Sequence, residues 1–129
     1  MENKTNEATP LRPLGDRTLN AHLVDADLNK LIVQLKNEST WQENGRNSIT
    51  LFKSEKLRIV LVGLHAEAEL REHSTSAMLS VQVVSGKIHF RSETNNLPLE
   101  SGQMVVLHEN IAHYVLAEKE SFFLLTLVK

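Results

Sequence analysis

The 129-residue chain contains no cysteine, which excludes disulfide bonds, thiolate nucleophiles, cysteine-ligated zinc and iron–sulfur clusters. Any bound metal must therefore use histidine and oxygen ligands. The 14 basic and 16 acidic side chains give a formal net charge of -2, so the chain lacks the positive charge that attracts nucleic acids or anionic lipids. No apolar run approaches the roughly 20 residues that cross a bilayer, and residues 1–17 hold no apolar signal segment. We therefore expect a cytoplasmic protein that binds neither nucleic acid nor membrane.

The motifs of the common nucleotide-binding and serine-hydrolase families are also missing. The chain has no glycine-rich phosphate loop, no Gly-x-Gly-x-x-Gly fingerprint and no Gly-x-Ser-x-Gly turn. What the chain does have is enough apolar material for one core, because 41% of its residues are hydrophobic. One globular domain is therefore expected.

The N-terminal third divides into two parts. Residues 1–18 are polar, hold two of the three prolines and show no periodicity, which predicts a disordered tail. Residues 19–46 predict one amphipathic helix followed by a turn-rich linker that carries the single tryptophan, Trp41, and Arg46. The apolar side chains with helical spacing are Leu28, Leu31, Ile32 and Leu35. Asp25 or Asp27 is available as the N-cap, and the helix is expected to end near Asn37.

From residue 47 onward the helical period is absent, and short alternating or β-branched runs predict a β domain over residues 47–129. The expected strands are 48–53, 57–65, 78–84, 87–92, 103–107, 113–117 and 122–128. Segments 57–64 and 122–128 are apolar on both faces, so we expect them in a sandwich interior or against another subunit. Ser85-Gly86 predicts a tight hairpin. The glutamates between residues 67 and 72 predict a solvated connecting segment.

Two segments that contain histidines resemble the two sequence motifs of the cupin family. They are GLHAEAELREHSTSAMLSVQVVSG, residues 63–86, and GQMVVLHENIAH, residues 102–113. Gly86 and Gly102 stand where the motifs have turn glycines, and the first and last histidine positions are taken by His73 and His113.

This resemblance covers most of residues 47–129 and extends to the small single-domain bacterial cupins. It implies an all-β fold, a cupin jelly-roll β-barrel, here with one N-terminal amphipathic helix. It also implies a site inside the barrel where three or four histidine or carboxylate ligands hold a divalent metal such as Fe, Mn, Ni or Zn.

The chain departs from the family pattern at two of the four ligand positions, where Thr75 and Leu79 stand. A catalytic metal normally keeps at least three protein ligands. The metal hypothesis therefore needs a third ligand in addition to His73 and His113. The candidates are His65, His108 and a carboxylate such as Glu72.

Strand alternation predicts which side chains share the barrel interior. If Leu79 points inward, Val81 and Val83 do so as well, and Val115 accompanies His113. An apolar interior with a few polar groups suits a small organic ligand. The predicted ligand-binding residues are His73, Thr75, Leu79, Val81 and His113.

Three functions remain open at this point. The first is a small cupin-barrel protein that binds a small organic ligand in an apolar pocket without a full metal site. The second is a metal-dependent cupin enzyme, of the dioxygenase, isomerase or decarboxylase type, that uses His73 and His113. The third is a structural dimerisation module whose histidines are hydrogen-bonded in the core. A homodimer is expected, because strands that are apolar on both faces leave more apolar surface than one small barrel covers.

Overall fold

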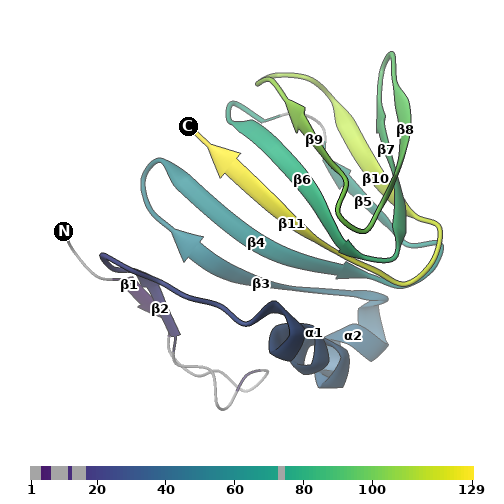
Figure 1. Ribbon diagram of the computed structural model, residues 1–129. Helices are drawn as coiled ribbons and strands as arrows, with labels where there is room; N and C mark the ends of the chain where they lie inside the picture. Colours follow the sequence, from purple (N-terminus) through teal and green to yellow (C-terminus); the bar gives the residue numbers. More distant parts are fainter. Residues whose placement is uncertain (1–3, 7–11, 13–16, 73–74) are drawn as a thin grey trace.

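The computed structural model describes residues 4–6, 12, 17–72 and 75–129 (Figure 1). Within these ranges, a five-stranded and a four-stranded antiparallel sheet face each other, with strand orders β3-β4-β11-β6-β9 and β5-β10-β7-β8. The first sheet consists of β3 (Arg46–Lys53), β4 (Leu57–Leu64), β11 (Ser121–Val128), β6 (Met78–Ser85) and β9 (Met104–Leu107). The second consists of β5 (Glu69–Glu72), β10 (His113–Ala117), β7 (Lys87–Ser92) and β8 (Asn96–Glu100). The predicted all-β jelly-roll barrel is confirmed.

All seven predicted strands are present, with ends shifted by no more than two residues, but β5 and β8 were not predicted. In β5, Leu70 packs against the core between the sheets, so the charged segment expected to be a connection is an edge strand with one apolar face. Strand β8 is the other edge of the same sheet and contains Pro98, which an edge position tolerates because no neighbour needs its missing N–H.

The hairpin predicted at Ser85-Gly86 is wrong, because β6 and β7 lie in different sheets. The chain turns a corner there and crosses from one sheet to the other. Gly86 has φ 93°, and a Cβ at this position would collide with the Ser121 hydroxyl and the Glu120 carbonyl. Glycine is therefore required at the corner by both its backbone conformation and the close approach of β11.

Two helices precede the barrel, where one was expected. Helix α1 (Leu28–Asn37) has the predicted extent, and the Asp27 side chain caps it by accepting a hydrogen bond from the Lys30 N–H at 3.2 Å. Helix α2 (Ser39–Asn44) occupies the segment expected to be a linker. So short a helix is marginal on its own, and here it is held by the burial of Trp41.

Part of the segment expected to be disordered forms a third, two-stranded sheet. Strand β1 (Lys4–Asn6) pairs with β2 (Arg17–Asn20). Leu19 is buried, and the Arg17 guanidinium donates to the Thr50 carbonyl on the free edge of β3 at 3.1 Å. These two contacts anchor β2 to the barrel.

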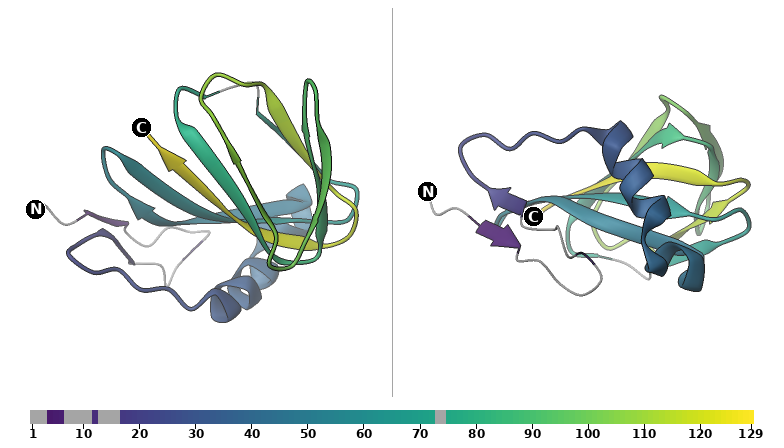
Figure 2. Two further views of the ribbon diagram at one scale, coloured as in Figure 1. Left: turned by 45° about the horizontal axis from the view of Figure 1, so that its top comes forward. Right: turned by 90° about the horizontal axis from the view of Figure 1, so that it is seen from below.

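Strands β4 and β11 are apolar on both faces, as predicted, and each face has its own cover. Their inner faces contribute to the core between the sheets, whereas Leu61 and Phe122 on the outer face pack against Leu35 and Trp41 of the helices. Figure 2 shows α1 and α2 lying against this outer face. Helices of this chain, rather than a second subunit, therefore cover this part of the sheet.

No helix in the described ranges is long and apolar enough to cross a membrane.

Candidate functional site

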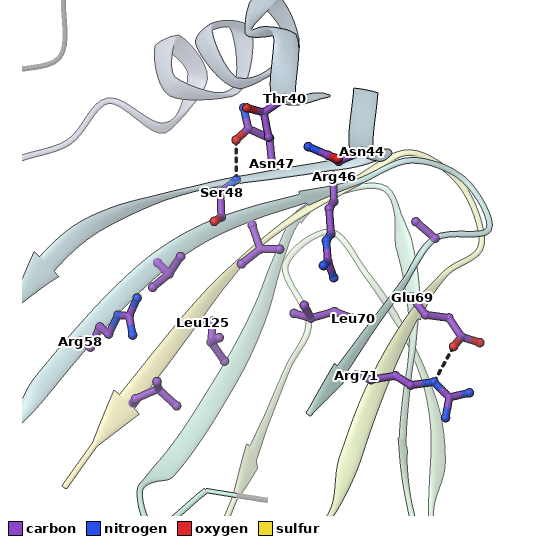
Figure 3. A pocket seen from close by; sticks show the side chains of 14 residues that line it. Thr40, Asn44, Arg46, Asn47, Ser48, Arg58, Glu69, Leu70, Arg71 and Leu125 are labelled. Carbon is purple, nitrogen blue, oxygen red and sulfur yellow. Dashed lines mark hydrogen bonds and ion pairs between the residues drawn. The ribbon is translucent and has the colours of Figure 1, made fainter. Parts of the chain in front are cut away.

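An open cavity of about 1000 Å³ lies between the two sheets on the side of their edge strands β3 and β5 (Figure 3). Its aliphatic floor comes from three strands. The side chains are Val60 and Val62 of β4, Leu125 and Leu127 of β11, and Leu70 of β5. Because these strands come from both sheets, the cavity is a continuation of the barrel interior toward solvent.

The polar rim of the cavity follows from strand alternation. On β3, Asn47 and Ile49 are buried toward the helices, which places Arg46 and Ser48 on the inner side. On β4, Arg58 shares the inner face with the two floor valines. The side chains of Arg46 and Arg58 make no hydrogen bond or ion pair with any residue that the structure describes.

The remaining charges at the cavity belong to β5. Arg71 Nε lies 3.0 Å from Glu69 Oε2, and the Arg71 guanidinium stacks over the Tyr114 ring at 5.5 Å. Figure 3 shows Arg46 extending into the opening from β3, while Leu70 and Arg71 come from the facing sheet. The rim therefore has three guanidinium groups and one carboxylate.

A polar network holds the start of β3 against the helices, immediately behind the cavity. The Asn47 amide donates to Glu38 Oε1 at 2.9 Å and to the Leu35 carbonyl at 3.1 Å. Burial raises the pKa of Glu38, but hydrogen bonds from Arg12, Asn47 and Gln34 outweigh it and hold the pKa below its ordinary value. The network fixes the strand that carries Arg46.

His113 lies at the start of β10 and is buried, with 6% of its surface exposed. Its Nδ1 donates to the Ile111 carbonyl at 3.0 Å, and its ring stacks on Phe90 with centroids 5.6 Å apart. Because a carbonyl only accepts, the neutral ring carries its lone pair on Nε2. That nitrogen has no hydrogen-bond partner in the described part of the chain.

The other predicted ligand-binding residues are distributed as follows. Thr75 lies beside the loop before His113, since its carbonyl accepts from the Asn110 N–H at 2.7 Å. Leu79 and Val81 are sealed in the core between the sheets. His73 lies outside the described residues. None of the described four lines the cavity.

The proposed third metal ligands differ in their placement relative to His113, and of the three only Glu72 is its neighbour in the sheet. His108 is exposed and pairs with the neighbouring Glu109. His65 packs on Trp41 with ring centroids 4.1 Å apart, and it precedes the residues that pair with Ala117, at the opposite end of β10 from His113. The backbone of Glu72 is paired with that of His113.

The described residues supply no group of three or more histidine or carboxylate side chains that fits a metal ion. They therefore do not form the three-ligand site that metal-dependent chemistry requires. With His73 outside the described ranges, the metal hypothesis stays a prediction.

No protein-family model matches this chain, and no curated protein matches it in sequence. Solved structures do match. A protein of Thermus thermophilus superposes with a TM-score of 0.69 at 16% identity, over 82% of this chain and 97% of that chain. A conserved protein of unknown function from Streptococcus pyogenes superposes with a TM-score of 0.66 at 23% identity, over 86% of this chain and 91% of that chain. An RmlC-like cupin protein from Desulfovibrio desulfuricans superposes with a TM-score of 0.62 at 20% identity, over 84% of this chain and 94% of that chain.

The chain has the cupin fold. At identities this low the likeness shows the fold alone, and one fold hosts many unrelated chemistries. The function of this cupin-fold protein must therefore be argued from its own site.

Sequence reasoning missed most of the cavity. The sequence pattern places Arg46 in a linker, although it begins β3 and lines the opening. A usable signal was present in β4, where strict alternation places Arg58 on the same face as Val60 and Val62. The contribution of β5 has no such signal, because its charged residues predict a solvated connection.

Proposed function

We propose that this cupin-fold protein binds a small organic ligand in the cavity between β3, β4, β11 and β5. The observation that carries the proposal is the aliphatic floor, which opens to solvent instead of being sealed by the facing sheet. Ligand sites are typically concave, of roughly 300–1000 Å³, mainly apolar and lined by a few polar groups. The cavity has this volume, and it combines an aliphatic floor with a polar, arginine-rich rim.

The same observation favours ligand binding over a purely structural dimerisation module. A module whose only task is to pair with a second copy has no need for an apolar cavity between its sheets. Such a cavity leaves apolar surface in contact with water, which costs about 25 cal/mol for each Å². A bound apolar ligand removes this cost.

The test uses N-phenyl-1-naphthylamine, an uncharged apolar molecule whose fluorescence rises when it leaves water. We expect saturable binding to the purified protein. Val62→Phe projects a ring onto the cavity floor and is expected to weaken binding at least about tenfold, because the floor is shared by the probe and the new side chain. Ile59→Phe, on the outer face of the same strand, is the matched control and is expected to leave binding unchanged.

Thermal unfolding of both variants checks that they remain folded. Absence of saturable probe binding, or equal binding by the two folded variants, would overturn the proposed location of the site.

A further inference from the structure

We propose that the cavity selects an apolar molecule that ends in an oxyanion group, with the anion held by Arg46 and the apolar part on the aliphatic floor. This inference rests on the proposed function and adds the chemical class of the ligand. It is carried by the placement and pairing of the charged residues at the rim.

The positive charge at the cavity is local. The chain as a whole has a formal net charge of -2, yet the cavity lining contains three arginines, at positions 46, 58 and 71, and one carboxylate, Glu69. The carboxylate is paired with Arg71. Arg46 and Arg58 are left without a protein anion among the described residues. A guanidinium presents a planar fork of donors that matches carboxylate and phosphate oxygens.

The two unpaired arginines lie at opposite ends of the aliphatic floor. Arg46 pairs across the β3–β4 ladder with Leu64, whereas Arg58 pairs with Lys53 at the other end. The two positions are six residue steps apart along β4, which corresponds to roughly 20 Å along the strand. One small anion therefore contacts only one of them.

Arg46 is the better anion site of the two. Thr40 and Asn44 of α2 line the cavity at its end and offer further donors, and the Asn47 network fixes the strand from which it extends (Figure 3). The aliphatic floor begins at Val62, next to the end of the cavity where Arg46 lies. A ligand with its anion on Arg46 thus lays its apolar part along the floor toward Arg58.

The test measures displacement of N-phenyl-1-naphthylamine by three ten-carbon compounds: decanoate, decyl phosphate and decan-1-ol. We expect at least one of the two anions to bind about tenfold more tightly than the alcohol at low salt, and the advantage to shrink in 0.5 M NaCl because the guanidinium is solvent-accessible. The two anions distinguish a carboxylate from a phosphate headgroup.

Arg46→Gln is expected to remove this advantage while leaving decan-1-ol binding unchanged, and Arg46→Lys to restore part of it. Lys119→Gln, which removes the same charge from an exposed turn outside the cavity, is the control and is expected to behave like the natural chain.

The two proposals fail separately. If the naphthylamine does not bind, the proposed function fails. If the naphthylamine binds, two results would show that the cavity binds apolar molecules without selecting an anion, and the present inference would be wrong. One is equal displacement of the probe by the anions and the alcohol. The other is an anion advantage in Arg46→Gln equal to that in the Lys119→Gln control.

Discussion

The two halves of the barrel differ in whether their interior or their outer face is covered. Around β6, β7 and β10 the interior is sealed, with Leu79, Ile88 and Phe90 no more than 3% exposed. Around β3, β4 and β5 the interior opens into the cavity. The outer faces show the reverse. In the open half, α1 and α2 cover β3, β4 and part of β11, whereas in the sealed half the outer side chains of β9 are exposed.

The difference shows where a small two-sheet barrel has room for a ligand. In the sealed half, large side chains from both sheets meet and fill the space. In the open half, the four-stranded sheet ends at the short edge strand β5, so the aliphatic floor of the opposite sheet has no facing partner over part of its area. The outer helices keep that half folded while its interior stays accessible.

The sharpest test of this comparison deletes the same atoms in each half. Leu79→Ala in the sealed half is expected to lower the free energy of unfolding by about 4 kcal/mol, because a dry cavity is left behind. Leu125→Ala at the open cavity is expected to cost about 2 kcal/mol, because the space that it leaves joins the existing cavity and no new closed cavity forms. Equilibrium unfolding in urea measures both. Equal losses would mean that the two halves are packed alike.

A second test concerns the polar network that holds β3 at the edge of the open half. Glu38→Gln removes the charged acceptor shared by Arg12, Asn47 and Gln34 and is expected to lower the free energy of unfolding by about 1.5 kcal/mol at pH 7. The pKa of Glu38 is lowered in the folded protein, so its contribution is present above the ordinary pKa of a glutamate and is lost as the pH falls through the lowered value.

Urea unfolding of the natural chain and of Glu38→Gln at pH 7 and at pH 3 measures this contribution. The difference between the two proteins is expected to narrow at the lower pH. A difference that stays constant would show that the network stabilises β3 without involving the charge of Glu38.

The sequence predicted the sealed half better than the open half, for a physical reason. Strands such as β6 and β10 bury one face completely, and their alternation is visible in residues such as Val81 and Val115. The open half is built from β5, whose glutamates and arginine obscure the single inward leucine, and from α2, which depends on the burial of Trp41. Local pattern does not contain these tertiary contacts.

The absence of tertiary contacts from local sequence patterns also explains why the sequence did not predict the cavity residues. Expectations for ligand-binding residues followed the positions of the family motifs and pointed to Leu79 and Val81, which lie in the sealed half. The cavity residues Arg46 and Arg58 lie outside both motifs. Which side of a barrel stays open depends on how far each edge strand extends in space, and the spacing of residues in a motif does not determine this.

The last test concerns the bare outer face of the sealed half. Met104 and Val106 of β9 are 51% and 62% exposed, so the expected homodimer is proposed to use this surface, which α1 and α2 leave uncovered. Val106→Lys is expected to raise the dissociation constant of the dimer at least about tenfold, because it would bury an unpaired charge. Asn95→Lys, in the exposed turn between β7 and β8, is the control and is expected to leave it unchanged. Sedimentation equilibrium measures the dissociation constant of each protein. A monomeric natural chain would refute the homodimer. A Val106→Lys dimer with an unchanged dissociation constant would show that the interface lies on another face.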